Sequence, residues 1–358
     1  MNESTYEPGS VATARHDAEP APRHGFAEPL DEGGPTPRVL AAVPADRRTA
    51  PAKDSPRPPQ QSRGSAAEHE HDAAAAARER ASRVGPTGRT IPDFPDPAPL
   101  DQHGPARIVA VCNQKGGVGK TTSTINLGAA LAEYGRRVLL VDFDPQGALS
   151  VGLGVNPHEL DLTIYNLLME RGISIDEVLL KTNVAGLDLL PSNIDLSAAE
   201  VQLVNEVARE QSLLRVLSAV RDDYDVIVID CQPSLGLLTV NALTAADSVI
   251  VPLECEFFAL RGVALLADTI EKVRDRLNPS LQLEGILPTM YDARTVHGRE
   301  VLQRVVEAFG DEVFHTVIGR TVRFPETTVA GEPITTYASA SSGAKAFRQL
   351  AREVLARW

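Results

Sequence analysis

The sequence predicts an α/β fold in which a mostly parallel, twisted sheet carries helices on both faces and follows a disordered tail. Three observations predict it. The proline content falls sharply near residue 105, short apolar segments then alternate with longer amphipathic ones, and a glycine-rich loop follows the first apolar segment. Strands that are buried on both faces read as continuous apolar runs, and the helices between them form the crossovers of a parallel sheet.

Residues 1–105 are predicted to form the disordered tail. They hold 17 of the 26 prolines and almost no hydrophobic periodicity. Such a segment cannot bury enough apolar surface to offset the entropy lost on ordering it. The tail carries 12 Lys and Arg against 16 Asp and Glu, so it is mildly acidic. It is either a dispensable extension or a tether for a partner, and its composition does not separate the two.

Residues 106–358 are predicted to form one domain. Short runs rich in Val, Ile and Leu are its expected strands, and segments with apolar residues every three to four positions are its expected helices. The strands are Ile108–Cys112, Val138–Val141, Leu187–Leu190, Val226–Ile229, Val249–Val251, Gly285–Leu287 and Val313–Val317. The helices are Lys120–Tyr134, Ser197–Val220, Leu237–Ala245, Leu260–Arg276, Gly298–Ala308 and Ala344–Trp358.

The composition argues against several classes of protein. No apolar run approaches the roughly 20 residues of a membrane-spanning helix, and the N-terminus has no apolar stretch of the secretory kind. The three cysteines, Cys112, Cys231 and Cys255, include no CxxC pair, which indicates reduced thiols rather than a disulfide framework or a metal cage. We therefore expect a cytoplasmic protein. The net charge of −13 argues against a surface coated in positive charge, although local patches decide whether a polyanion binds.

A phosphate-binding loop follows the first expected strand. Residues 114–122 read QKGGVGKTT and lead into a helix. Glycines let the backbone curl so that successive N–H groups point at phosphate oxygens, and the helix N-terminus adds positive potential. Lys120 is expected to reach the β- and γ-phosphates, and the Thr121 hydroxyl to bind Mg²⁺. The sequence thus predicts a P-loop nucleotide-binding site made by Gln114, Lys115, Gly116, Gly117, Val118, Gly119, Lys120, Thr121 and Thr122.

This loop departs from the usual GxxxxGK[ST] pattern at its entrance. Gln114 stands where the first glycine is usual, and a second lysine, Lys115, follows it. Lys115 is poorly placed to bind its own nucleotide in the way that Lys120 does. A cation at this position is instead available to the nucleotide of a facing subunit.

Two acidic segments follow expected strands. Asp142 and Asp144 come after Val138–Val141, and Asp230 comes after Val226–Ile229. Ligands bind outside this end of the strands in an open α/β sheet. Phosphoryl transfer to water needs Mg²⁺ near the β- and γ-oxygens and a water aligned with the γ-phosphorus. Carboxylates at adjacent strand ends can supply both, and Asp142 is alternatively a buried structural acid.

The KGGVGKTT form resembles the deviant Walker motif of the ParA/MinD ATPase family. The likeness extends over residues 107–358 through VLLVDFDPQG, DCQPSLGLLTVNAL, VPLECEFFALRG, TMYDART and VFHTVIGRTVRF, which together look like the Soj-type chromosomal ParA branch. The resemblance implies an ATP hydrolase with a P-loop NTPase fold, with ATP and Mg²⁺ as cofactors, and with slow turnover until a partner stimulates it. Lys115, Lys120 and Asp144 are its implied catalytic residues. In this family Lys115 crosses the interface of an ATP-bound homodimer, Asp144 aligns the attacking water near Mg²⁺, and Asp230 acts on Mg²⁺ through water.

The same resemblance implies chromosome partitioning on the nucleoid. Its dimers bind double-stranded DNA nonspecifically through Arg294 and Arg323, and a ParB-like centromere-binding protein stimulates hydrolysis. Phosphate contacts by arginines give affinity that does not depend on base sequence and falls with salt. Thr321 lies in a segment near the adenine in relatives. There Gly319 replaces a common proline and Thr321 a common asparagine, so a side-chain amide contact to the base is lost.

Two other functions stay open: a MinD-like, membrane-associated regulator of cell division, and a ParA-like positioner of another cargo. The last expected helix bears on the first, because it carries an apolar stripe of Phe347, Leu350, Ala351, Val354, Leu355 and Trp358. Such a stripe either inserts into a membrane interface or packs on the sheet. Packing is favoured because no flexible linker separates this helix from the fold, so a membrane partner is not expected. The cysteine spacing does not suit an Fe–S reductase, and the last tyrosine, Tyr337, is not part of the terminal cluster of a bacterial tyrosine kinase.

Overall fold

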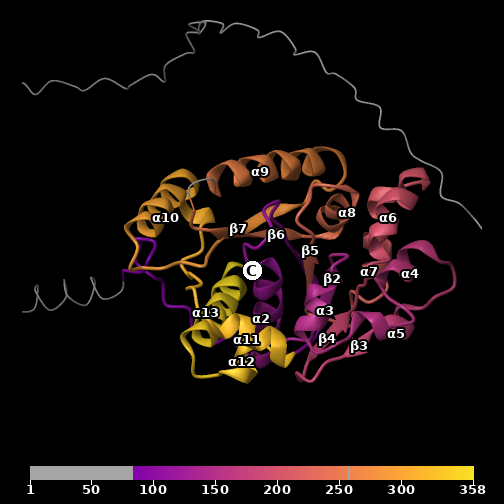
Figure 1. The fold of residues 1–358 in the computed structure, drawn as a ribbon, viewed down its shortest axis with the longest axis horizontal. Helices are drawn as coiled ribbons and strands as arrows, with labels where there is room; N and C mark the ends of the chain where they lie inside the picture. Colours follow the sequence, from indigo (N-terminus) through magenta and orange to yellow (C-terminus); the bar gives the residue numbers. More distant parts are fainter. Residues whose placement is uncertain (1–83, 257–258) are drawn as a thin grey trace, which may run out of the picture. The chain divides into compact units, whose positions relative to one another are not determined.

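The computed structural model describes residues 84–256 and 259–358. A seven-stranded sheet runs through this part of the chain in the order β3-β4-β2-β5-β1-β6-β7 (Figure 1). All neighbouring strands pair in parallel except β3, which pairs antiparallel with β4. The strands are β1 (Arg107–Val111), β2 (Val138–Phe143), β3 (Leu180–Lys181), β4 (Leu187–Leu190), β5 (Val226–Cys231), β6 (Ser248–Glu254) and β7 (Gln282–Thr289). The predicted α/β fold with a mostly parallel sheet is confirmed.

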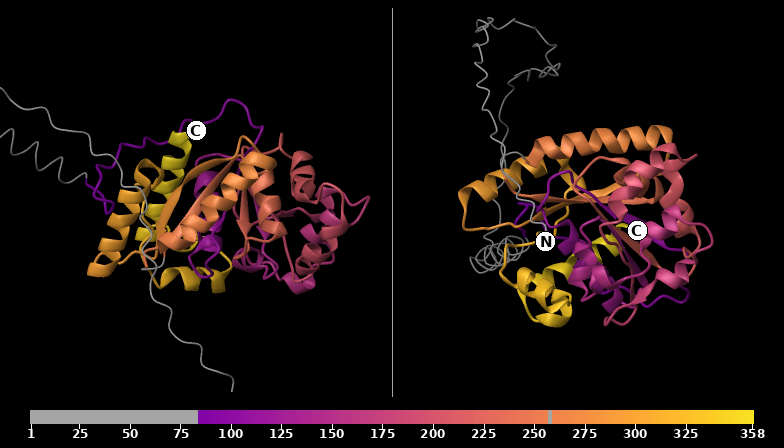
Figure 2. Two further views of the ribbon diagram at one scale, coloured as in Figure 1. Left: turned by 90° about the horizontal axis from the view of Figure 1, so that it is seen from above. Right: turned by 45° about the vertical axis from the view of Figure 1, so that its right-hand side comes forward.

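Helices cover both faces of the sheet (Figures 1 and 2). They are α2 (Lys120–Glu133), α3 (Ala148–Gly152), α4 (Ile164–Met169), α5 (Ile175–Val178), α6 (Leu196–Gln202), α7 (Ser212–Ser218), α8 (Leu237–Ala245), α9 (Ala259–Arg276), α10 (Val296–Phe309), α11 (Arg323–Ala330), α12 (Ile334–Tyr337) and α13 (Ser342–Arg357). Successive residues of a strand point to opposite faces. Ile108 and Ala110 of β1 therefore join the core beneath α8, while Val109 and Val111 join the core beneath α2 and α13.

The last helix packs against the sheet. Phe347, Leu350 and Val354 of α13 have no exposed surface, so the domain already covers this part of the stripe, while Trp358 at its end is 37% exposed. Within the described ranges, no helix has both the length and the apolar character needed to cross a membrane.

The expected helix Ser197–Val220 is wrong as a single element. It divides into α6 and α7, with the short 3₁₀ turns Leu203–Asn205 and Arg209–Gln211 between them. Ala208 has a φ of 54°, a left-handed conformation that ends a right-handed helix. Asn241 of α8 holds the break, because its side chain donates to the Arg209 carbonyl and accepts from the Leu213 N–H.

The expected strand Val313–Val317 is also wrong. Only Val313 forms a bridge, with Ile286 of β7. The next free N–H groups, those of His315 and Thr316, donate to the buried carboxylate of Glu353 on α13, at 2.7 and 2.9 Å. Phe314 still donates its N–H to the Ile286 carbonyl of β7, but regular pairing stops there and the Glu353 side chain takes the next two N–H groups.

Residues 84–105 differ from the predicted disordered tail. This stretch lies on the domain: the Arg136 side chain donates to the Ala98 carbonyl at 3.1 Å, and His103 Nδ1 lies 2.7 Å from an Asp225 carboxylate oxygen. Buried backbone and side-chain polar groups of the domain thus find partners in a segment whose composition predicted none. The predicted disorder of residues 1–83 lies outside the described residues.

Candidate functional site

The glycine-rich loop joins β1 to α2 as an open cradle. Gly117 and Gly119 have φ values of 76° and 87°, which only glycine adopts without strain. A Cβ added at Gly116 or Gly117 would meet nothing within 4 Å, so the rim of the loop borders open space. The centre is anchored instead: Val118 is buried, and its carbonyl accepts a 2.8 Å hydrogen bond from the Thr289 hydroxyl at the end of β7. The loop therefore offers backbone N–H groups and a helix N-terminus to an anion.

Lys120 closes the inner side of this cradle. Its side chain is largely buried, and its Nζ donates to the Lys115 carbonyl at 3.1 Å. Burial lowers the pKa of Lys120, although the charges of Asp230 and Asp144 act in the opposite direction. A partly desolvated ammonium held over an open loop is suited to bind phosphate oxygens.

The two predicted acidic segments meet at neighbouring strand ends. Asp142 of β2 and Asp230 of β5 are register partners, and β5 lies between β2 and β1, the strand that leads into the cradle. Asp142 has no exposed surface and accepts hydrogen bonds from the Ser150 N–H and hydroxyl at 2.8 and 2.7 Å. Burial raises the pKa of Asp142 to about 6. Its bonds anchor α3, so the structure supports the interpretation of Asp142 as a structural acid.

Asp144 lies one step beyond β2 and is almost completely buried. Its Oδ1 accepts the Gln146 N–H at 3.0 Å, which fixes the turn into α3. Its charge acts on both Lys120 and Asp230, so the three predicted site residues lie together.

Asp230 has the chemistry of a cation ligand. Its Oδ1 is 3.4 Å from the Thr124 hydroxyl, but its buried Oδ2 has no hydrogen-bond partner among the described residues. Burial and then the charge of Asp142 raise the pKa of Asp230 to about 8, while the nearby Thr121 side chain acts in the opposite direction. The described residues contain no group of three or more His, Cys, Asp or Glu that could hold a metal ion. Asp230 and Thr121 therefore fit Mg²⁺ that takes its remaining ligands from phosphate and water oxygens.

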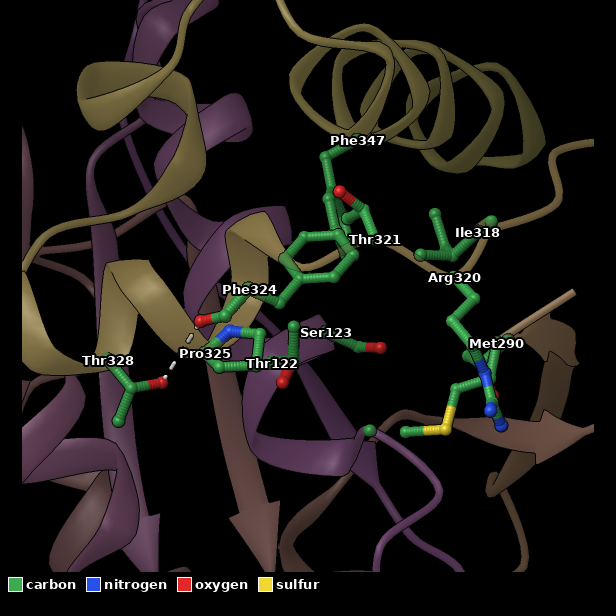
Figure 3. Close-up of a pocket in the computed structure, with 13 residues that line it drawn as sticks. Thr122, Ser123, Met290, Ile318, Arg320, Thr321, Phe324, Pro325, Thr328 and Phe347 are labelled. Atoms are coloured by element: carbon green, nitrogen blue, oxygen red, sulfur yellow. Dashed lines mark hydrogen bonds between the residues drawn. The ribbon is translucent and has the colours of Figure 1, made fainter.

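A pocket of about 360 Å³ adjoins the cradle at Gly119 and Thr122 (Figure 3). The predicted Thr321 lies in its lining together with Gly319, which places this segment beside the phosphate loop. Its other lining residues are Ser123, Thr289, Met290, Ile318, Arg320, Phe324, Pro325, Thr328 and Phe347.

Two aromatic side chains of this lining were missed at the sequence level. Phe324 and Phe347 contact each other edge to face, with ring centroids 5.8 Å apart. Phe347 belongs to the apolar stripe of α13, and helical spacing carries no sign that this residue also lines a pocket. Met290 has a φ of 50°, an unusual conformation for a side chain of its size, and no local pattern in the sequence signals it.

The side chain of Lys115 does not join that of Lys120, although the Lys115 carbonyl accepts from the Lys120 ammonium. The Lys115 ammonium is 2.9 Å from Glu254 and 2.7 Å from Glu256, at and just beyond the end of β6. The structure therefore brings the cradle, Lys120, Asp144 and Asp230 together, and it directs the entrance lysine away from them.

The predicted DNA-binding arginines lie on the surface and are paired. Arg294 contacts Asp292 at 2.8 Å, and Arg323 at the start of α11 contacts Glu326 at 2.8 Å. Hydrogen bonds from Arg294 lower the pKa of Asp292 to about 2. Each arginine thus has an acidic neighbour that a DNA phosphate would have to displace.

Comparisons with known proteins agree with this geometry. Residues 106–283 match the AAA domain family. The chain is 48% identical over 250 residues to the sporulation initiation inhibitor protein Soj of Bacillus subtilis, which covers 70% of this chain and 98% of the relative. It is 48% identical over 255 residues to the chromosome partitioning protein ParA of Caulobacter vibrioides, which covers 71% and 95%. A solved structure of cobyrinic acid a,c-diamide synthase from Mycobacterium smegmatis with bound ADP and magnesium is 44% identical, with a TM-score of 0.63 over 71% of this chain and 95% of that chain. On these similarities, the chain belongs to the ParA/Soj family of chromosome-partitioning ATPases within the wider ParA/MinD group.

Proposed function

We propose that this chain hydrolyses ATP in a nucleotide-dependent homodimer that binds nucleoid DNA and partitions chromosomes. One observation carries the proposal: an open glycine cradle, a buried lysine and an unpartnered carboxylate oxygen converge beside a pocket of about 360 Å³. This combination suits a triphosphate with a divalent cation, and the pocket next to it suits a nucleoside.

Each residue of the site has a distinct role in this proposal. Lys120 neutralises the β- and γ-phosphate oxygens, and the loop N–H groups orient them. Thr121 and Asp230 hold Mg²⁺, with Asp230 acting through water. Asp144 aligns the attacking water with the γ-phosphorus. When bound, Mg²⁺ neutralises the charge that develops on the phosphate oxygens. The nucleoside lies along Thr321, which has no side-chain amide, so the contacts of this segment to the base come from its backbone.

Lys115 is the residue that makes hydrolysis depend on a second subunit. It contacts the phosphates of the partner's nucleotide, so ATP closes the dimer and loss of the γ-phosphate opens it. Slow basal turnover follows, and a ParB-like partner stimulates it.

Three substitutions test this mechanism, with nucleotide binding and oligomeric state measured for each. Lys120→Ala weakens ATP binding by about a hundredfold or more, since a buried charge–phosphate contact is lost. Lys115→Ala retains much of the binding but prevents the ATP dimer. Asp144→Ala keeps the dimer and blocks its hydrolysis. Normal ATP-dependent dimers of Lys115→Ala would contradict the cross-subunit role.

DNA binding follows from the dimer. Two copies of the surface that holds Arg294 and Arg323 bind one duplex together, so avidity makes the affinity depend on ATP. The expected partners are therefore nonspecific double-stranded DNA and a ParB-like centromere-binding protein, on the nucleoid in the cytoplasm.

The burial of the α13 stripe argues against the membrane-associated alternative. Phe347, Leu350 and Val354 would have to leave the core before they could enter a bilayer. Flotation with anionic lipid vesicles in Mg²⁺ and ATP separates the two functions, and we expect the protein to stay at the bottom of the gradient. A ParA-like role with another cargo would share the ATP and DNA chemistry and differ in the partner that co-purifies with Asp144→Ala.

A further inference from the structure

The ammonium of Lys115 lies between two carboxylates of its own subunit. Its Nζ is 2.9 Å from Glu254 and 2.7 Å from Glu256. Side chains of Lys115 and Glu256 are about half exposed, while that of Glu254 is 12% exposed. Lys115 is thus accessible to solvent and at the same time bound by two carboxylates.

The backbone of Lys115 is tied to the same strand as its side chain. The Lys115 N–H donates to the Asn113 side-chain oxygen at 2.9 Å, and the Asn113 amide donates to the Pro252 carbonyl of β6 at 2.7 Å. Glu254 is the last residue of β6. The backbone of Lys115 is therefore linked to β6 through Asn113, and its ammonium is linked to β6 through Glu254.

The charges around Lys115 suit an exchange. Burial by itself would lower the pKa of Lys115, but hydrogen bonds and charges from Glu254 and Glu256 outweigh it and raise the pKa. Ion pairs this exposed are individually weak. A triphosphate carries several negative charges on closely spaced oxygens, so it can compete for the ammonium against two separate carboxylates.

Arg320 gives Glu254 a second partner. Its guanidinium lies 3.4 Å from the other oxygen of Glu254. If Lys115 moves away, the mostly buried Glu254 still has a counter-charge, and the cost of leaving a buried carboxylate unpaired is avoided. Arg320 also lines the proposed nucleoside pocket. Glu254 therefore contacts both Lys115 at the entrance of the phosphate loop and Arg320 in the wall of that pocket.

We infer that Glu254 and Glu256 are positioning residues that hold Lys115 on its own subunit until the phosphates of a second copy's nucleotide displace them. This inference rests on the proposed ATP dimer and adds a condition for forming it: the nucleotide must compete with two carboxylates for Lys115. The two carboxylates keep nucleotide-free and ADP-bound subunits apart by occupying the lysine that would join them. Only a neighbour loaded with triphosphate offers enough negative charge to take it.

The first experiment does not require a dimer. Lysines of the full chain in Mg²⁺ and ADP are labelled with acetic anhydride and quantified by mass spectrometry. Glu254→Gln/Glu256→Gln raises the labelling of Lys115 by roughly three- to tenfold, since a lysine that loses two carboxylates is less protonated. The exposed Lys345 serves as the internal reference and keeps its rate. Unchanged labelling of Lys115 would overturn the inference.

The second experiment measures the dimer. In Mg²⁺ and ATP, the dimer dissociation constant of Glu254→Gln/Glu256→Gln is expected to fall by about three- to tenfold, because the lysine no longer has to be taken from two acids. Glu300→Gln/Glu307→Gln removes the same charge from exposed positions on α10 and controls for general repulsion between subunits. An equal effect of the two double variants, or a weaker dimer of the first, would overturn the inference. If the unmodified protein forms no dimer with ATP, the proposed function fails, and the labelling result still decides whether the carboxylates hold Lys115.

Discussion

At the scale of single residues, the protein opposes the ionisation of Asp230 more strongly than that of Asp142. Asp230 combines complete burial, an unpartnered oxygen and a pKa of about 8. A carboxyl group in the unfolded chain titrates near 4. In the absence of a cation, the folded protein therefore prefers Asp230 protonated, and ionising it destabilises the fold.

This difference predicts the dependence of stability on pH. Because the pKa of Asp230 is higher in the folded state, its contribution to stability is present at low pH and lost as the pH rises through about 8. We expect the melting temperature of nucleotide-free protein in a chelator to fall between about pH 5 and pH 8, the range between the unfolded and folded pKa values of Asp230. Asp230→Asn, which cannot ionise, should reduce this fall, and Mg²⁺ with ATP should reduce it in the unmodified protein. Identical slopes for the unmodified protein and Asp230→Asn would contradict this account of the site.

At the scale of elements, α13 supports the segment that leads to the pocket beside the phosphate loop. Its Glu353 is fully buried, accepts the N–H groups of His315 and Thr316, and contacts Arg357 at 3.1 Å. The chain continues from these two residues to Thr321. The position of the pocket wall thus depends on a carboxylate 32 residues beyond it in sequence.

Replacing Glu353 by Gln should therefore weaken the fold. An amide has one oxygen acceptor for two backbone N–H groups and leaves Arg357 without its counter-charge, so we expect a loss of about 3 kcal/mol in the free energy of unfolding. Denaturant titration measures this loss. The same change at the exposed Glu300 on α10 should stay within about 0.5 kcal/mol. Equal stabilities for the two variants would show that the buried carboxylate is not needed.

At the scale of the whole molecule, positive and negative charges are distributed unevenly along the chain. The chain has a net charge of −13, yet residues 294–358 hold nine Lys and Arg against seven Asp and Glu. A weak local excess of this kind binds a polyanion only when it is repeated, as it would be in the proposed dimer.

The expected DNA affinity should therefore depend on ATP and on salt. Removing one phosphate contact lowers the slope of log affinity against log salt by about 1. Arg323→Ala removes one contact per subunit, so we expect a decrease of about 2 for the ATP dimer. Glu326→Gln, which frees Arg323, should strengthen binding. Fluorescence anisotropy with random-sequence duplex measures both effects.

Arg171, exposed in the loop after α4, provides a matched control. Arg171→Ala removes the same charge away from the proposed surface and should leave the salt slope unchanged. If Arg171→Ala and Arg323→Ala lower the slope equally, the binding surface lies elsewhere.

Local patterns in the sequence determined the fold class and the inner part of the site. Spacing within short segments is enough to recognise the glycines of the cradle, Lys120 and the acids that follow two strands. A parallel sheet then brings the ends of its strands to one edge, whatever the details of packing. Local patterns did not identify Thr321, because nothing in that segment itself indicates a pocket. Only the resemblance to a family pointed to it.

The tertiary structure alone decided the features that depend on contacts between distant segments. The Glu353 carboxylate replaces strand pairing at Thr316, and Asn241 holds the turn that divides the expected helix at Ala208. Lys115 lies on Glu254, which is 139 residues away. A hydrogen bond or ion pair between such residues leaves no periodic trace in either segment, so its partners become known only once the chain is folded.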